Sequence, residues 1–131
     1  MRTEAREAVL KILYAGIMNP SDVETVKKAL LKKLTEEEFD FAVALLETIE
    51  QHEDRIVEMI DANISHFKED RLYPIDRAIL MIAVAEILYF DDIPPVISAS
   101  EGTDMAQKYS TEKSADFVNG VLSGVIKQCT K

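Results

Sequence analysis

Apolar residues recur along the whole chain at three- and four-residue steps, the period of a helix that buries one face. Segments with this period cover residues 5–16, 23–31, 39–49, 56–67, 75–90, 96–108 and 117–126. The segment at 75–90 is apolar almost throughout, which predicts the most buried helix. No segment alternates polar and apolar residues with the two-residue period of a strand. The pattern therefore predicts an all-α fold of about seven helices.

Capping and breaking residues separate these segments. Ser21–Glu24 and Thr35–Glu38 both have capping-box spacing, in which a hydroxyl and a carboxylate bond free amides at a helix start. Pro74 suits the first turn of a helix. The polar residues 51–54 predict a break or bend, and Asp91–Pro95 is the clearest interruption because proline disfavours helical geometry in the preceding residue.

Length predicts a single domain that covers residues 1–131, long enough to bury a core without a metal or a disulfide. The charged segment from Lys68 to Arg71 is the best candidate for an internal division. It would separate an N-terminal sub-bundle of about 1–70 from a C-terminal sub-bundle of about 71–131.

Cysteine content and apolar run lengths indicate where the protein works. The only cysteine is Cys129, so no intramolecular disulfide can form and a reducing compartment fits. Glu4 and Glu7 interrupt any secretory signal, and no apolar run approaches the ~20 residues that span a bilayer. We expect a cytoplasmic protein with no membrane contact.

Charge is distributed unevenly. The net charge of −9 argues against a general nucleic-acid binder, since phosphate contacts need clustered Lys and Arg. Residues 1–33 nevertheless hold seven basic and four acidic side chains, whereas residues 34–70 hold twelve acidic and two basic ones. Residues 71–131 are close to balanced, with six basic and eight acidic side chains. The basic surface is therefore expected at the N-terminal end.

Signatures of catalysis do not occur in the sequence. No Gly-rich phosphate loop precedes a helix, no His or Cys pair has metal-ligand spacing, and no Gly-x-Ser-x-Gly elbow is found. His52 and His66 are isolated, so we interpret both as exposed or hydrogen-bonded helix residues. We therefore expect neither enzymatic activity nor a cofactor.

Ordered motifs across the chain resemble the NusB family of transcription antitermination factors. The N-terminal motifs are Ala5–Ala8 and Leu13–Tyr14. The C-terminal motifs are Pro74–Leu80, Ala85–Leu88, Asp92–Pro94, Glu101, Ala106, Lys108–Tyr109 and Lys113–Leu122. The resemblance covers essentially the whole chain and is most specific at Phe117–Leu122.

This resemblance implies two packed three-helix sub-bundles and a role in ribosomal RNA transcription. The implied partners are boxA-type single-stranded RNA, ribosomal protein NusE and the transcription elongation complex, and a homodimer is a further alternative. The implied RNA-binding residues are Arg2, Arg6, Tyr14, Lys113 and Phe117, with Glu86 as a candidate contact to RNA or NusE.

Physical chemistry gives several of these residues a plausible role. Arg2 and Arg6 lie four residues apart and can present two guanidinium groups on one helix face. Lys113 and Ser114 precede a predicted helix start, where free amides favour a phosphate and Ser114 can act as N-cap. Tyr14 and Phe117 can either stack on bases or pack in the core, and the sequence leaves both open.

Three departures from the family pattern bear on function. One arginine stands where a run of arginines is common, Ala99–Gly102 replaces Ile-Asn-Glu-Ala, and Gln107 replaces a lysine. Gly102 costs the helix expected at residues 96–108 roughly 1 kcal/mol of propensity, so a loose helix is expected there.

A protein-interaction adaptor with little RNA affinity is the alternative function. A third, the NusB-like domain of an RNA cytosine methyltransferase, would need a separate catalytic chain.

Overall fold

The computed structural model describes residues 2–64 and 72–129, and every regular element in these residues is helical. The elements are α1 (Arg2–Met18), a short 3-10 turn η1 (Pro20–Asp22), α2 (Val23–Lys32), α3 (Glu36–Gln51), α4 (Glu53–Ile64), α5 (Pro74–Tyr89), α6 (Pro95–Tyr109) and α7 (Glu112–Cys129). The all-α prediction of about seven helices is confirmed.

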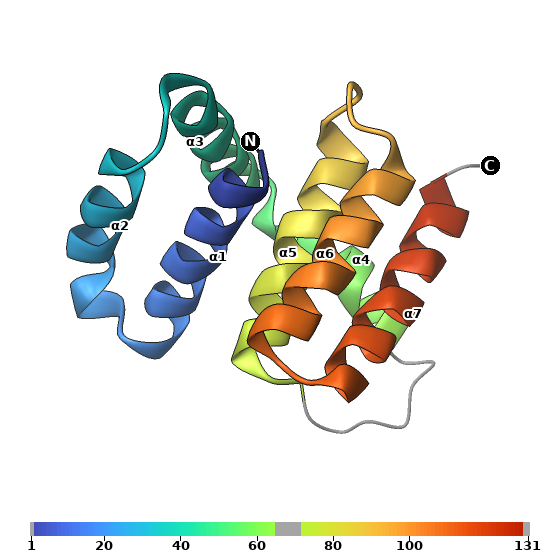
Figure 1. Ribbon diagram of the computed structural model, residues 1–131. Helices are drawn as coiled ribbons and strands as arrows, with labels where there is room; N and C mark the ends of the chain where they lie inside the picture. The colour runs from blue at the N-terminus through green and yellow to red at the C-terminus, as the bar shows by residue number, and fades with distance from the viewer. Residues whose placement is uncertain (1, 65–71, 130–131) are drawn as a thin grey trace.

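The helices form two groups of three with α4 beside the second (Figure 1). Helices α1, α2 and α3 contact one another, as do α5, α6 and α7. Contacts of α1 and α3 with α5 join the groups. Although α4 precedes the division expected at Lys68–Arg71, it packs mainly on α5 and α7. That segment, His66 and the expected helix end at Phe67 lie outside the described residues.

Helix α5 is the centre of the core. Every residue from Ala78 to Glu86 is buried, because α1, α3, α4, α6 and α7 all pack around this helix. Side chains such as Ile79, Leu80 and Ile82 are completely inaccessible to solvent. The expectation that this segment is the most buried helix is confirmed.

One of the two expected capping boxes forms. The Thr35 hydroxyl accepts a hydrogen bond from the Glu38 amide at 3.2 Å, and Glu38 Oε1 accepts one from the Thr35 amide at 3.0 Å. The box expected at Ser21–Glu24 is wrong. Residues 20–22 form a 3-10 turn instead, so α2 begins only at Val23 and Ser21 lies before its N-cap residue, with its hydroxyl donating to Asn19 Oδ1.

Helix α7 begins one turn earlier than the apolar pattern indicates. The Thr111 hydroxyl accepts a hydrogen bond from the Ser114 amide at 2.9 Å and therefore caps the helix. Ser114 is buried in the first turn, so its expected role as N-cap is wrong. The break before α4 is also shorter than expected, since only His52 separates α3 from α4 and its ring stacks on Tyr89 at 4.0 Å.

Gly102 allows close packing of α6. A Cβ atom at this position would lie 3.1 Å from Leu122 Cδ1 on α7 and 3.4 Å from Ala83 Cβ on α5. The glycine is buried in a regular part of α6, so this residue serves helix packing rather than marking a loose helix.

Two further findings concern the described residues alone. None of their helices combines the length and the hydrophobicity needed to cross a bilayer. Residues 2–64 and 72–129 also contain no group of three or more His, Cys, Asp or Glu side chains arranged to hold a metal ion.

Candidate nucleic-acid interface

A buried ion pair joins α1 to α5 and α6. Arg6 Nε donates to Glu86 Oε2 at 2.7 Å, and Arg6 Nη2 donates to Glu86 Oε1 at 2.9 Å. The Ser98 hydroxyl on α6 donates to the same Oε1 at 2.8 Å, and Glu101 lies 3.4 Å from Arg6 Nη1. This geometry is bidentate, the strongest arrangement for an arginine and a carboxylate.

The ion pair determines what Arg6 and Glu86 can contact. Their side chains are 5% and 1% exposed, so both charges face each other rather than solvent. Arg2 and Arg6 do share one face of α1, and both guanidinium groups lie over the Phe41 ring, at 4.5 and 5.4 Å from its centroid. Only Arg2 presents its guanidinium to solvent, because α5 and α6 cover Arg6.

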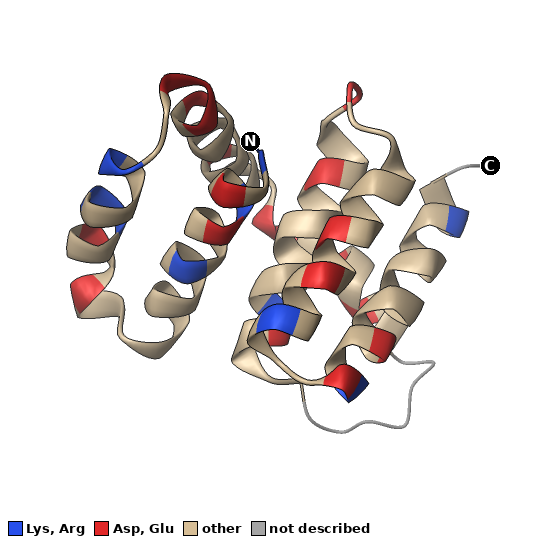
Figure 2. Cartoon of the chain, in the orientation of Figure 1, with Lys and Arg blue, Asp and Glu red and all other residues tan. Residues whose placement is uncertain are grey.

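Arg2 borders a hollow at the start of α1. The hollow has a volume of about 840 Å³, and the aromatic rings of Phe41 and Phe90 lie in its wall. Five carboxylates line it against two guanidinium groups. One of these carboxylates, Asp92, lies 3.4 Å from Arg2. Figure 2 shows the acidic ends of α3 and of the α5–α6 connection on either side of this region. The hollow therefore offers flat rings and acceptors, with little excess positive charge for a phosphate.

A second cationic cluster lies where α1 meets the end of α6. Lys108 Nζ donates to Glu7 Oε2 at 2.9 Å, and the Tyr109 hydroxyl donates to Glu7 Oε1 at 3.0 Å. Lys11 and Lys108 lie 5.9 and 5.3 Å from the centroid of the Tyr109 ring. We call this cluster of Glu7, Lys11, Lys108 and Tyr109 the α1–α6 seam.

Ionisation in the seam is coupled. Burial alone would raise the pKa of Glu7, but hydrogen bonds from Lys108 and Tyr109 outweigh it and lower that pKa. The Glu7 carboxylate in turn raises the pKa of Lys108. Burial, together with the bond to Glu7, raises the pKa of Tyr109. Glu7 is thus held ionised and Lys108 keeps its charge, with the Lys108 side chain 59% exposed.

Tyr14 lies one helical turn beyond Lys11 and is 38% exposed. It therefore does not pack fully in the core, and its ring is accessible beside the seam. Lys113 and Phe117 lie one turn apart on α7, where Lys113 is exposed and Phe117 is half-buried against the core. Ser114 between them donates to Asp76 Oδ2 at 2.8 Å, which anchors this corner to α5.

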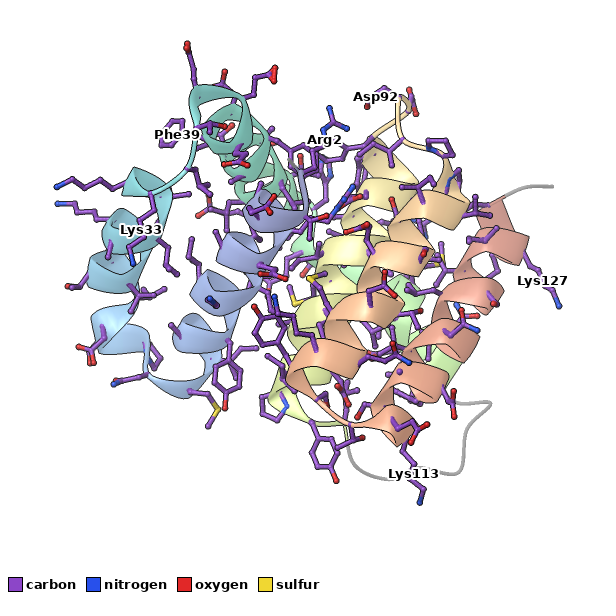
Figure 3. All side chains as sticks on the ribbon, in the orientation of Figure 1. Arg2, Lys33, Phe39, Asp92, Lys113 and Lys127 are labelled. Atoms are coloured by element: carbon purple, nitrogen blue, oxygen red, sulfur yellow. The ribbon has the colours of Figure 1, made fainter. Side chains whose placement is uncertain are left out.

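The structure does not gather the expected residues into one pocket. Figure 3 places Arg2 and Lys113 at opposite ends of the helical bundle. The α1–α6 seam lies on α1 and α6 between these ends, and Tyr109 is followed within four residues by Lys113. Arg2, the seam, Tyr14 and the Lys113–Phe117 corner therefore form a discontinuous band.

Sequence reasoning missed Lys11, Lys108 and Tyr109 as site residues. Glu7, Lys11 and Tyr14 do recur at helical spacing, and this signal could have placed the first lysine beside Tyr14. The partnership with Lys108 and Tyr109 has no sequence signal, because about 100 residues separate them from Glu7.

Fold and surface together define a small all-helical bundle with a band of cationic and aromatic side chains on α1, α6 and α7. The chain belongs to the NusB family, whose model matches residues 3–127. It is 37% identical over 125 residues to the transcription antitermination protein NusB of Bacillus subtilis (strain 168), covering 95% of this chain and 93% of that protein. It is 36% identical over 129 residues to NusB of Methylacidiphilum infernorum, covering 96% and 90%.

Solved structures give the same relationship. The chain superposes with a TM-score of 0.84 and 26% identity on a chain in a crystal structure of antitermination factors NusB and NusE in complex with dsRNA, covering 97% of this chain and 96% of that one. It superposes with a TM-score of 0.81 and 30% identity on NusB from T. maritima, covering 98% and 92%.

Proposed function

We propose that this protein is a transcription antitermination factor that binds boxA-type single-stranded RNA together with ribosomal protein NusE and supports ribosomal RNA transcription. The observation that carries the proposal is the band of exposed cations and rings on α1, α6 and α7 in a chain of the NusB family. The protein acts in the cytoplasm as a non-catalytic adaptor for the elongation complex.

The phosphates and the bases of the RNA are expected to contact different residues of the band. Arg2, Lys11, Lys108 and Lys113 are exposed and supply the positive charge that a phosphate backbone needs. The Tyr14 ring and the accessible part of Phe117 offer flat faces for splayed bases. Arg6 and Glu86 act as positioning residues, since their ion pair holds α1 against α5 and α6.

NusE is required because the basic surface of this chain is small. The four exposed cations of the band lie among many carboxylates, so RNA affinity is expected to be weak without a partner. A second RNA-binding protein on the same strand raises affinity by extending the shared face. The structural relative that contains both NusB and NusE in complex with dsRNA supports this assembly.

The corner at the start of α7 tests the proposal. Lys113→Ala should weaken binding to all single strands and reduce the log-log salt slope by about 0.7, the value for one lost phosphate contact. Phe117→Ala should cost roughly 1–3 kcal/mol of RNA affinity if a base stacks on the ring, with an unchanged salt slope. Lys127→Ala, an exposed lysine at the other end of α7, is the matched control and should alter neither quantity.

Thermal melts separate stacking from core packing at Phe117. If the ring acts only in the core, Phe117→Ala should remove about 3–5 kcal/mol of folding stability, and the loss of RNA binding is then secondary. A destabilised Phe117→Ala, combined with normal RNA binding by Lys113→Ala, would refute this corner as a site.

The second candidate function is a protein-interaction adaptor with little RNA affinity, favoured by the carboxylates around Arg2. Fluorescence anisotropy with a boxA-like oligonucleotide, measured with and without NusE, distinguishes the two functions. We expect weak, salt-sensitive binding that strengthens when NusE is added. RNA binding that is equally weak in both samples would favour the adaptor.

A further inference from the structure

An apolar groove lies between α1, α2 and α3, on the side of α1 away from the α1–α6 seam. Its volume is about 630 Å³, and its floor reaches Met81 on α5. The apolar lining includes Leu13, Ile17, Val23, Leu31, Phe39 and Leu46. On an α-helix with 3.6 residues per turn, Leu13 projects roughly opposite to Lys11, whereas Ile17 lies one turn beyond Tyr14. None of the proposed RNA-binding residues lines the groove, so the groove is a separate surface whose Ile17 end borders Tyr14.

Helix α2 leaves this groove open. None of its residues is buried, although its apolar side chains face α1 and α3, and its contacts with α3 are sparse. Ile17 and Phe39 are each 42% exposed at the groove. Large apolar side chains gathered at an accessible groove, rather than scattered singly, mark an interaction surface.

Charges at the groove are mostly negative. Glu47, Glu50 and Glu53 follow one another at three-residue steps along the α3–α4 side, and Glu24 lies on α2. Lys27 and Arg77 are the two cations in the lining. Among residues 2–64 and 72–129, none of the three acids on the α3–α4 side has a cationic group within 4.0 Å. This side therefore presents a row of uncompensated carboxylates.

We propose that the groove binds an amphipathic helix of a protein partner whose flanks carry Lys or Arg. The apolar stripe of such a helix has side chains at i, i+3, i+4 and i+7, which would fill the groove beside Ile17 and Phe39. Its basic flank lies along Glu47, Glu50 and Glu53. A volume of about 630 Å³ falls in the ordinary range for a binding pocket and accommodates a few apolar side chains. The groove lining and the proposed RNA-binding residues share no member, so RNA and this helix occupy separate sites.

A designed peptide tests the charge argument. The probe is a fluorescein-labelled helix of about 18 residues with leucines at the stated spacing and lysines on both flanks. Glu47→Lys together with Glu50→Lys should weaken its binding about tenfold, because two attractions become repulsions. The matched control is Glu58→Lys with Asp61→Lys, which has the same spacing and charge change on the exposed side of α4. The control should lose less than about threefold, through long-range electrostatics alone.

A second pair of variants tests the apolar part. Phe39→Ala should weaken peptide binding about fivefold or more because the ring lines the groove. Met18→Ala, which removes a 56% exposed side chain outside the groove, should leave binding unchanged. Circular dichroism melts should show both variants folded, and RNA affinity should be unchanged in both.

Three results would overturn the proposal. Equal losses in the two charge-reversal variants would mean non-specific attraction to an acidic protein. A peptide with glutamates in place of the lysines that binds equally well would remove the charge argument. A concentration-dependent dimer in analytical ultracentrifugation that Phe39→Ala abolishes would show that a second copy of the chain covers the groove.

Discussion

Breaking the Arg6–Glu86 pair should destabilise the whole fold. The two side chains are 5% and 1% exposed, and three hydrogen bonds of 2.7–2.9 Å link Arg6, Glu86 and Ser98 across α1, α5 and α6. Removing one partner of a buried pair leaves an uncompensated charge and typically costs 3–5 kcal/mol. Glu86→Leu and Arg6→Met should each lose about this much, and the melting temperature of a chain of this size should fall by roughly 10–20 °C.

The double variant Arg6→Met with Glu86→Leu is the decisive comparison. Apolar side chains of similar volume remove both charges together, and such replacements are often neutral or stabilising. Ser98 and Glu101 each lose a partner, so we expect recovery of most, but not all, of the stability lost in the single variants. Urea denaturation of all four proteins gives the coupling energy directly.

The same four proteins determine how Arg6 contributes to RNA binding. If Arg6 only positions α1, the folded double variant should bind RNA with the affinity and salt slope of the natural sequence. A slope reduced by about 0.7 would mean that Arg6 contacts a phosphate, contrary to its burial. Single variants that lose less than about 1 kcal/mol would refute the reasoning, since the pair would then be solvated.

Two further predictions concern the contacts of α6 with its neighbours. The pKa of Glu7 is lower in the folded protein than the ordinary carboxyl value of 4.5, so its ion pair stabilises the fold above that value. This stability is lost as the pH falls through the pKa of Glu7 in the folded protein. Glu7→Gln should remove this part of the acid dependence of the melting temperature. Gly102→Ala should leave stability within about 0.5 kcal/mol of the natural protein, because crowding by Leu122 Cδ1 at 3.1 Å offsets a helix-propensity gain of about 1 kcal/mol. If chemical denaturation shows that Gly102→Ala raises the free energy of unfolding by the full ~1 kcal/mol, α6 and α7 can move apart to accommodate the methyl group without loss of stability.

Hydrophobic period and local capping were enough to predict the fold class and most helix positions. Thr35 and Glu38 lie three residues apart, so their reciprocal hydrogen bonds depend only on local backbone geometry and could be predicted. At the start of α7, the hydroxyls of Thr111 and Ser114 were both candidates to cap the helix. Thr111 caps the helix because Ser114 is drawn inward to Asp76, a residue 38 positions away.

Which single side chains are exposed at the surface depends on helix packing. The four-residue spacing of Arg2 and Arg6 correctly placed them on one face of α1, but spacing cannot tell which part of that face another helix covers. The Glu86 carboxylate, 80 residues from Arg6 in the sequence, binds the Arg6 guanidinium and buries it. Arg2 therefore remains the exposed arginine of this face. Tyr14 is exposed for a related reason, since none of the helices in the described part of the chain packs over the end of its face of α1 closely enough to bury it.

Pairings between distant segments explain the remaining differences. Lys108 and Tyr109 gain their roles from Glu7, and the groove beside Phe39 exists because α2 packs loosely against α3. A helical period specifies which face of each helix is apolar but not which neighbour will cover it. Local sequence patterns therefore specify an all-α protein with a basic N-terminal end, while helix packing controls which charges remain available for binding.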